Sequence, residues 1–216
     1  MKKILFLMII CQLSCRSQVE CPEGINVIPM YGEVTKCEQQ IRLDKEFISE
    51  SEQQFKSKKI AAEYYVSKGW EYFYKNDDNT AMKRFNQAWL LDDSNPEIYW
   101  GFGNLLGRKN KFEESLKYLK KSITINSNNT KVYECMAISY GQLFYQTKDS
   151  LYLKLRIESL QKAIKLEPKN GTALGELATT YAFTKQKDSL LHYIKKADAV
   201  DLKIINPEIK KLIKNK

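Results

Sequence analysis

One stretch of the chain, residues 96–129, constrains the fold more than any other, because it joins two short amphipathic segments through a polar turn. Apolar residues recur at helical spacing in its first half, at Tyr99 and Leu106, and in its second half, at Leu116 and Leu119. Helices of this length are marginal in water by themselves, and each has a single apolar stripe. Neighbouring copies of the same helical hairpin must therefore cover that stripe.

The same pattern recurs on both sides of this stretch, with a small residue at one fixed place. These residues are Gly69, Gly103, Ala137 and Ala178, at successive spacings of 34, 34 and 41. The pattern resembles the tetratricopeptide repeat, a helical hairpin of about 34 residues. The resemblance implies an all-α solenoid of about four hairpins, in which the small residues let the two helices of one hairpin approach closely.

The resemblance divides the chain into an array and its flanking segments. Four repeats occupy 62–204, at 62–95, 96–129, 130–170 and 171–204. Before them come a targeting segment at 1–15, an irregular leader at 16–40 and a helix at 41–61, and after them comes a basic helix at 205–216. We expect the helix at 41–61 to cap the array, because the first repeat otherwise exposes an apolar face.

The sequence allows more detailed predictions for the helix at 41–61 and for the third repeat. In the preceding helix, Leu43, Phe47 and Phe55 are the candidate inward-facing residues. The third repeat contains seven residues more than the pattern requires. Either both helices of that hairpin are longer, or their turn is an elaborated loop.

The first fifteen residues have the order of a secretory signal. Two lysines precede the apolar run Ile4–Ile10, which is too short to span a bilayer. Leu13-Ser14-Cys15 resembles the end of a bacterial lipobox, which implies that Cys15 is lipidated, with palmitate-type chains. Such chains would anchor the protein to a membrane of the cell envelope, facing away from the cytosol. Ordinary cleavage and an uncleaved signal are the alternatives, since Gln12 stands where an aliphatic residue is usual.

Two further cysteines, Cys21 and Cys37, lie in the leader and enclose 15 residues. An oxidising compartment would let them pair, and loop closure then suggests about 3 kcal/mol of stabilisation. Two free thiols in a flexible leader are the alternative. No His, Asp or third Cys stands near them at metal-ligand spacing, so we expect no metal site.

The sequence offers no candidate catalytic residues, and we expect neither an enzyme nor a cofactor. The single histidine, His192, lies in a helical segment, and Cys135 is expected to be a small buried apolar residue. Gly101 and Gly103 are inside a helix and lack the preceding strand of a dinucleotide fingerprint. The formal charge is +9, but its lysines lie mainly on second helices, as a solvated face, so we expect no nucleic-acid partner.

In the family that the pattern resembles, the first helices of successive hairpins line a concave groove. The residues at groove-facing positions are aromatic at the N-terminal end of the array and mostly polar beyond it. They suit an extended or helical peptide, unless the aromatic ones pack beneath the preceding helix or the leader. The candidate groove residues are Trp70, Phe73, Tyr74, Trp100, Asn104, Arg108, Glu134, Ile138, Gln142 and Phe183.

The best-known peptide mode of the family clamps a C-terminal carboxylate with paired Lys, Asn and Arg residues. Asn104 matches one such place, but Val66 and Trp100 stand where a lysine and an asparagine are wanted. We therefore expect no carboxylate clamp.

These features together predict a non-catalytic scaffold that mediates protein–protein interaction at a bacterial envelope membrane. The alternative is a lipoprotein that binds a carbohydrate or small ligand through Trp70, Tyr74 and Trp100. An intracellular chaperone adaptor is disfavoured, because the N-terminus resembles a signal and the clamp is missing. Partner identity and oligomeric state are open.

Overall fold

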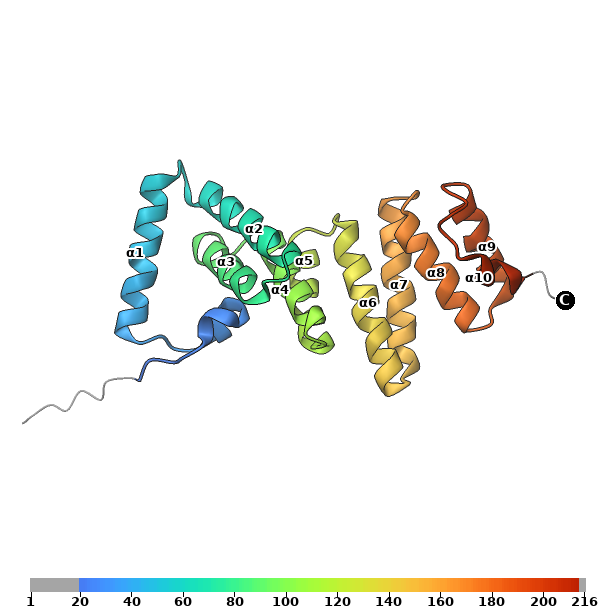
Figure 1. The fold of residues 1–216 in the computed structure, drawn as a ribbon, viewed down its shortest axis with the longest axis horizontal. Helices are drawn as coiled ribbons and strands as arrows, with labels where there is room; N and C mark the ends of the chain where they lie inside the picture. The colour runs from blue at the N-terminus through green and yellow to red at the C-terminus, as the bar shows by residue number, and fades with distance from the viewer. Residues whose placement is uncertain (1–19, 214–216) are drawn as a thin grey trace, which may run out of the picture.

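The structure is a computed structural model that describes residues 20–213. These residues form ten α-helices and two short 3₁₀ helices, and no strand occurs among them. The helices lie side by side in chain order, in one elongated row (Figure 1). The all-α solenoid expected from the sequence is therefore confirmed.

Four helical hairpins make up most of the row. They are α2 (Lys58–Tyr74) with α3 (Asp78–Leu91), α4 (Pro96–Arg108) with α5 (Phe112–Ile125), α6 (Thr130–Thr147) with α7 (Ser150–Leu166), and α8 (Gly171–Phe183) with α9 (Lys187–Asp198). The flanking elements are the 3₁₀ helices η1 (Ile25–Val27) and η2 (Pro29–Glu33), then α1 (Glu38–Gln54), and at the other end α10 (Pro207–Lys211). None of the described helices is long and apolar enough to cross a membrane.

Polar residues set the ends of the hairpin helices. Asn95, Asn129 and Asn170 are the N-caps of α4, α6 and α8, and each side-chain oxygen accepts a hydrogen bond from a backbone N–H of the first turn. Asn76 and Asn110 adopt positive φ in the turns that follow α2 and α4. Asparagine tolerates that conformation better than most residues. The same turn therefore forms at the same place in both hairpins, at the repeat spacing.

Glycines allow close packing between helices. A Cβ atom on Gly69 of α2 would lie 2.6 Å from the ring of Phe85 in α3, and one on Gly103 of α4 would lie 2.6 Å from Leu119 in α5. Both contacts join the two helices of one hairpin, as the sequence predicted. Gly101 adds a contact that the pattern did not predict, because its Cβ would meet the same Phe85 ring from the next hairpin.

The third hairpin absorbs its extra residues as helix. Its helices α6 and α7 contain 18 and 17 residues, and only Lys148 and Asp149 lie between them. Of the two alternatives open from the sequence, the structure therefore shows longer helices rather than an elaborated turn.

The segment before the array departs from the expected boundaries. Instead of one helix at 41–61, α1 ends at Gln54 and α2 begins at Lys58, four residues before the expected start of the first repeat. The break has a local cause, because Ser57 accepts a hydrogen bond from the backbone N–H of Ile60 and caps the new helix.

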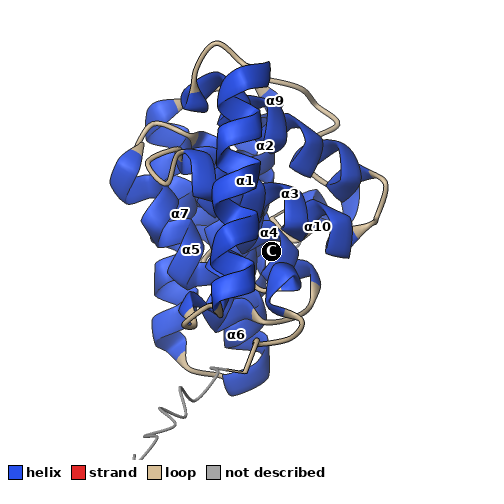
Figure 2. Cartoon of the chain, turned by 90° about the vertical axis from the view of Figure 1, so that its left-hand side faces the viewer, coloured by secondary structure: helices blue, strands red, loops and turns tan. Residues whose placement is uncertain are grey.

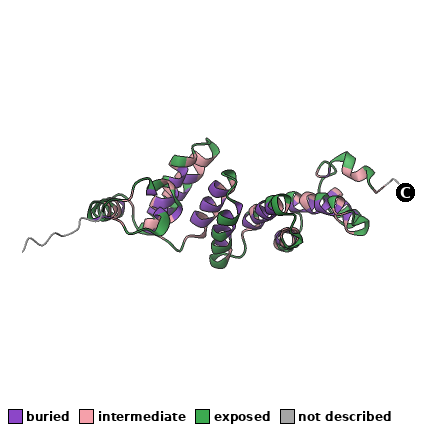
Figure 3. Ribbon diagram, turned by 90° about the horizontal axis from the view of Figure 1, so that it is seen from below, coloured by how far each residue is buried: buried purple, intermediate pink, exposed green. Residues whose placement is uncertain are grey.

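The helix α1 stands at the end of the row, with much of its surface exposed (Figures 2 and 3). Phe47 and Phe55 pack against Tyr65 of α2, with ring centroids 5.2 and 6.5 Å away. Leu43 is 52% exposed, so its assignment as an inward-facing residue was wrong. A helix with neighbours on one side only can bury fewer residues than its apolar pattern suggests.

Within the described part of the leader, residues 20–40, the chain forms η1 and η2 and folds onto α3, so it is less irregular there than the sequence predicted. A disulfide joins Cys21 to Cys37. The buried side-chain amide of Asn86 in α3 donates hydrogen bonds to the carbonyl oxygens of Asn26 and Ile28, at 3.0 and 2.8 Å. Residues 1–15, including Cys15, lie outside the described residues, and lipidation stays a prediction.

The Phe85 contacts predict the effect of enlarging Gly101. We expect Gly101→Ala to lower the free energy of unfolding by about 1–3 kcal/mol, because the added methyl group overlaps the Phe85 ring. Urea denaturation of the purified protein measures this. Gly107→Ala is the matched control, since its Cβ would meet only Ser115 Oγ at 3.5 Å, and we expect it to be neutral or stabilising. Equal stability of both variants would contradict the proposed packing.

Candidate functional site

The expected groove residues lie along one side of the row, on the face formed by α2, α4, α6 and α8, which we call the A-helix face. Trp100 of α4 links three of these helices. Its ring lies 4.5 Å, centroid to centroid, from that of Trp70 in α2. Its indole Nε1 donates a hydrogen bond to Cys135 Sγ in α6, at 3.4 Å. Trp70 and Trp100, which the sequence assigned to one surface, are thus in contact on this face.

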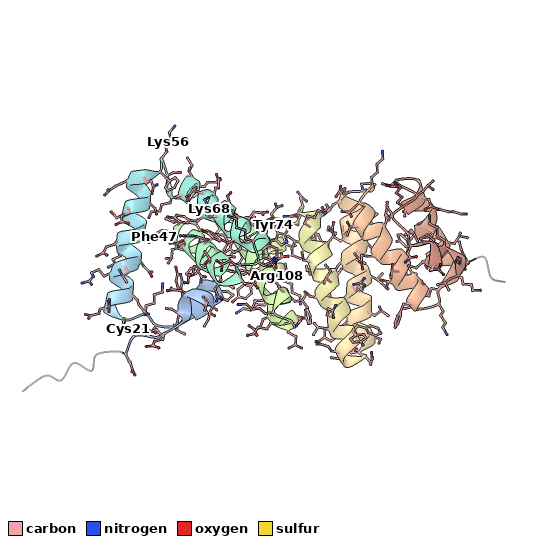
Figure 4. The ribbon with its side chains drawn as sticks, viewed as in Figure 1. Cys21, Phe47, Lys56, Lys68, Tyr74 and Arg108 are labelled. Atoms are coloured by element: carbon pink, nitrogen blue, oxygen red, sulfur yellow. A yellow bond between two sulfur atoms is a disulfide. The ribbon has the colours of Figure 1, made fainter. Side chains whose placement is uncertain are left out.

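Four aromatic residues form a cluster at the N-terminal part of this face. Besides Trp100, Trp70 contacts Phe73 at 5.4 Å and Tyr74 at 6.2 Å between ring centroids. Arg108 of α4 lies over the Phe73 ring, 3.6 Å from its centroid, close to Tyr74 as Figure 4 shows. This stacking brings a cation and aromatic rings from adjacent helices together.

The exposure of the cluster decides which of its members are available to a partner. Trp70, Phe73 and Trp100 are half-buried, and Trp70 also packs edge-on against Phe85 of the core. Tyr74 is 74% exposed. The first three residues therefore serve partly as core, whereas Tyr74 projects from the surface.

The leader and α1 occupy other surfaces. The leader contacts α3 through Asn86 and Trp89, and α1 contacts the start of α2 at Tyr65. Among the described residues, the leader and α1 therefore do not cover the aromatic cluster.

Arg108 is held in place by more than the aromatic ring. Its Nη1 donates hydrogen bonds to the carbonyl oxygen of Phe73 at 3.0 Å and to Asp78 Oδ1 at 2.7 Å. The guanidinium charge is therefore already paired within the chain. Arg108 orders this end of the face more than it offers a free cation to a partner.

Asn104 and Cys135 form a small polar bridge between α4 and α6. The Asn104 amide donates to the carbonyl oxygen of Trp100 at 2.8 Å, and the Cys135 thiol donates to Asn104 Oδ1 at 3.4 Å. Burial raises the pKa of the Cys135 thiol, so it stays protonated at neutral pH. This environment suits a packed thiol and not a nucleophile.

A cavity of about 110 Å³ opens on the A-helix face beside Trp100. Ile138, Ala137 and Leu160 contribute apolar walls. Lys131, Glu134, Thr172 and Glu176 add polar groups around it. The cavity thus lies between α4, α6 and α8, with Leu160 of α7 in its wall, and it adjoins the aromatic cluster through Trp100.

The carboxylates around this cavity have internal partners. Glu134 Oε2 lies 3.2 Å from Lys131 Nζ, and Glu134 Oε1 accepts a hydrogen bond from Asn170 at 2.7 Å. Glu176 Oε2 pairs with the guanidinium of Arg156, which also donates to the carbonyl oxygen of Ala137. One arginine from α7 therefore fastens α6 and α8 behind the cavity.

Glu97 is a third carboxylate of the A-helix face, at the start of α4. Burial raises its pKa, and Asn129 donates a hydrogen bond to Glu97 Oε1 at 3.1 Å, which partly offsets that rise. This contact also ties the second hairpin to the N-cap of the third.

The remaining expected groove residues are largely exposed, and of these Ile138 also lines the cavity beside Trp100. Gln142 is exposed, Ile138 is 53% exposed and Phe183 is 71% exposed. Phe183 has its own aromatic neighbour, Phe144 of α6, at 6.1 Å between ring centroids. The aromatic character of the face is therefore not confined to the N-terminal part.

Sequence reasoning did not assign Cys135, Thr172 or Glu176 to the site. The helical positions of Thr172 and Glu176 could have indicated them, because they lie on the first helix of the fourth repeat. The repeat pattern places Arg156 on the second helix of the third hairpin, but it did not connect this side chain with the site.

Comparison with known proteins supports the tetratricopeptide repeat. Residues 96–129 match the family model described as "Tetratricopeptide repeat". A search of curated protein sequences finds no significant match. Proteins with this repeat are generally non-catalytic scaffolds that bind protein or peptide partners.

Solved structures with the same fold include three of interest. A thermophilic tetratricopeptide-repeat protein of Thermus thermophilus, TTC0263, has a TM-score of 0.57 at 17% identity, over 70% of this chain and 79% of its own. PilF of Pseudomonas aeruginosa has a TM-score of 0.59 at 15% identity, over 72% and 67%. The first repeat domain of Spaghetti (RPAP3), solved with the HSP90 peptide SRMEEVD, has a TM-score of 0.51 at 21% identity, over 57% and 93%. At these identities the likeness shows the fold alone.

The exposure of the cluster predicts different effects for two of its members. We expect Trp100→Ala to lower the free energy of unfolding by about 3 kcal/mol, because it removes packing against Trp70 and the hydrogen bond to Cys135. We expect Tyr74→Ala to change it by at most about 0.5 kcal/mol, because its side chain is largely in solvent. Chemical denaturation measures both. A large loss in Tyr74→Ala would show that another part of the chain covers this residue.

Proposed function

We propose that this chain is a non-catalytic scaffold that binds a protein segment on its A-helix face, at a bacterial envelope membrane. The observation that carries the proposal is the row of large apolar side chains exposed on this face, Tyr74, Ile138 and Phe183, on three different helices. Exposed apolar side chains gathered on one face mark interaction surfaces more often than scattered ones do.

The dimensions of the face suit an extended segment. Neighbouring packed helices lie about 8–10 Å apart, so the path from α2 to α8 crosses about 30 Å. An extended chain advances about 3.3 Å per residue, and about nine residues would cover that path. The peptide-bound RPAP3 domain gives a precedent for a segment held by this fold.

A peptide is favoured over a carbohydrate by the arrangement of the rings. The rings of Trp70 and Trp100 contact each other in a tilted arrangement, at an interplanar angle of 55°, and both are half-buried. Stacking on a sugar needs an open ring face, and in this cluster only Tyr74 is largely exposed. Its isolated aromatic ring suits a side-chain contact in a longer interface.

The membrane part of the proposal rests on the N-terminal sequence. The charged, apolar and Leu-Ser-Cys order of residues 1–15 resembles a lipoprotein signal, with Gln12 in place of the usual aliphatic residue. Two acyl chains on Cys15 would anchor the protein without a transmembrane helix. The disulfide between Cys21 and Cys37 fits an oxidising compartment.

Affinity capture from detergent-solubilised envelopes, read by mass spectrometry, tests the binding face. We expect the double variant Tyr74→Ala/Phe183→Ala to capture the wild-type partner at least about 30-fold more weakly, as loss of hot-spot aromatics does. Leu202→Ala is the control, because Leu202 is exposed in the segment between α9 and α10. Undiminished capture by the double variant would refute the assignment of these residues to a partner surface.

Lipidation is tested separately by Cys15→Ser. We expect the variant to lose partition into the detergent phase of a Triton X-114 extraction, because it lacks the sulfur to which the lipid is attached. Intact-protein mass spectrometry of the wild type should show the added acyl mass and loss of residues 1–14. A wild-type protein that keeps its full signal and partitions like the variant would rule the anchor out.

A further inference from the structure

The third hairpin ends in a tip, residues 144–154, that extends beyond the neighbouring hairpins. Its helices α6 and α7 contain 18 and 17 residues, against 13 and 14 in α4 and α5. Because an α-helix rises about 1.5 Å per residue, α6 is about 7–8 Å longer than α4. In Figure 1 the turn between α6 and α7 lies at the lower edge of the row, below the ends of the neighbouring helices.

Two large apolar side chains are exposed at this tip. Tyr145, near the end of α6, is 73% exposed, and Leu151, in the first turn of α7, is 53% exposed. The second helices of the first and fourth hairpins begin instead with the polar pairs Asp78-Asn79 and Lys187-Asp188. The longer hairpin therefore carries apolar groups into solvent at a place where those two hairpins have polar ones. Exposed apolar groups that gather in this way indicate an interaction surface.

The polar groups of the tip suit the headgroup layer of a membrane. Lys148 is exposed, and its ammonium lies 4.3 Å from the centroid of the Tyr145 ring. Asp149 is the only carboxylate of the tip, and its Oδ1 accepts a hydrogen bond from the backbone N–H of Leu151 at 2.8 Å. Tyrosine and lysine are favoured at membrane interfaces, because each has an apolar body and a polar end that stays among the headgroups.

The described chain begins on the same side of the molecule as the tip. Figure 4 shows Cys21 near the lower edge and Lys56 at the upper edge, and Figure 1, in the same view, has the turn between α6 and α7 at the lower edge. Figure 2 is turned about the vertical axis and again has the start of the described chain and the end of α6 at the bottom. Views from two directions thus agree on this placement.

Two attachments fix the position of Cys21 relative to the array. The disulfide joins it to Cys37 at the N-cap of α1, and Asn86 of α3 donates hydrogen bonds to two backbone carbonyl oxygens of the leader. Five residue steps lead from Cys15 to Glu20, which is at most about 18 Å of extended chain. A lipid on Cys15 would therefore hold this side of the molecule, and the tip with it, toward the membrane surface.

Resting on the proposed membrane anchor, we infer that the tip of the third hairpin inserts into the interface of the same membrane. Tyr145 and Leu151 enter the boundary between headgroups and acyl chains, and the Lys148 ammonium stays beside the lipid phosphates. Two side chains bind a bilayer weakly by themselves, but the anchor makes their contact intramolecular and so raises its effective concentration. This second contact sets the orientation of the row of helices on the membrane.

A fluorescent label at the tip tests this inference on protein extracted from its membrane and reconstituted into vesicles. Gln146→Cys supplies the attachment site, because Gln146 is exposed and its replacement leaves Tyr145 and Leu151 in place. The vesicles contain equimolar phosphatidylethanolamine and phosphatidylglycerol, and part of the lipid carries a nitroxide high on its acyl chain. We expect the label to lose most of its emission to the nitroxide, after subtraction of the signal from wild-type chain treated in the same way.

Lys56→Cys is the matched control, because Lys56 is exposed on the opposite side of the molecule (Figure 4). A label at this position should keep its emission in the same vesicles. Equal quenching at the two positions would show that the row has no preferred orientation, and it would overturn the inference.

The double variant Tyr145→Ser/Leu151→Ser, made in the Gln146→Cys chain, tests the two apolar side chains directly. We expect it to lose the quenching, because the tip then has little apolar surface to insert. Both side chains are largely exposed, so its thermal melting should match that of the parent chain. Quenching that persists in the double variant would overturn the role of these two side chains.

The outcomes separate this inference from the proposed function. An acylated, membrane-bound chain with an unquenched tip would overturn the tip contact and leave the anchor intact. Quenching in a chain that mass spectrometry shows to be unacylated would support the tip contact and refute lipidation of Cys15. An unquenched tip whose double variant captures less partner from envelopes would assign the tip to a protein contact and overturn the lipid one. A chain that is unacylated and does not bind the vesicles would sink the anchor and this inference together.

Discussion

The ring of Phe85 is the contact on which the arrangement of the N-terminal half depends. It fills the space left by Gly69 on its own hairpin and by Gly101 on the next one, where any larger residue would overlap it. The Phe85 ring also packs edge-on against the Trp70 ring, with the two centroids 5.3 Å apart. Because protein cores are close-packed, this one ring fixes the spacing of α2, α3 and α4 together.

That spacing determines the surface on which the proposed function depends. With α2 and α4 held at this distance, Trp70 and Trp100 meet, and Trp100 reaches Cys135 of α6. Farther along, Arg156 fastens α6 to α8 through Ala137 and Glu176. These contacts hold the helices of the A-helix face in place behind its exposed side chains. Such preorganisation limits the conformational entropy that the chain loses when a partner binds.

The repeat pattern made the hairpins and the close glycine contacts predictable, because residues such as Gly69 and Gly103 report the approach of two helices that are neighbours in sequence. Contacts between hairpins were not predictable in this way. Gly101 meets Phe85 of a different repeat, and Asn86 binds the leader across about sixty residues of chain. Neither residue stands out in a hydrophobic pattern.

The same distinction applies to the candidate site. Its aromatic members follow from helical position, but their burial does not: Trp70 and Trp100 are half in the core, whereas Tyr74 is in solvent. The cavity depends on Arg156, whose position follows from how the extra residues extend α6 and α7. The repeat pattern places Arg156 on the second helix of its hairpin, but its contacts with Ala137 and Glu176 follow only from the packed structure.

Amide hydrogen exchange of the chain alone and with a saturating captured segment tests most directly the claim that the A-helix face is the recognition surface. The account predicts added protection in α2, α4, α6 and α8, centred near Trp100 and Ile138, with little change on the outer surfaces of α3, α5, α7 and α9. Protection confined to those second helices or to the leader would contradict it.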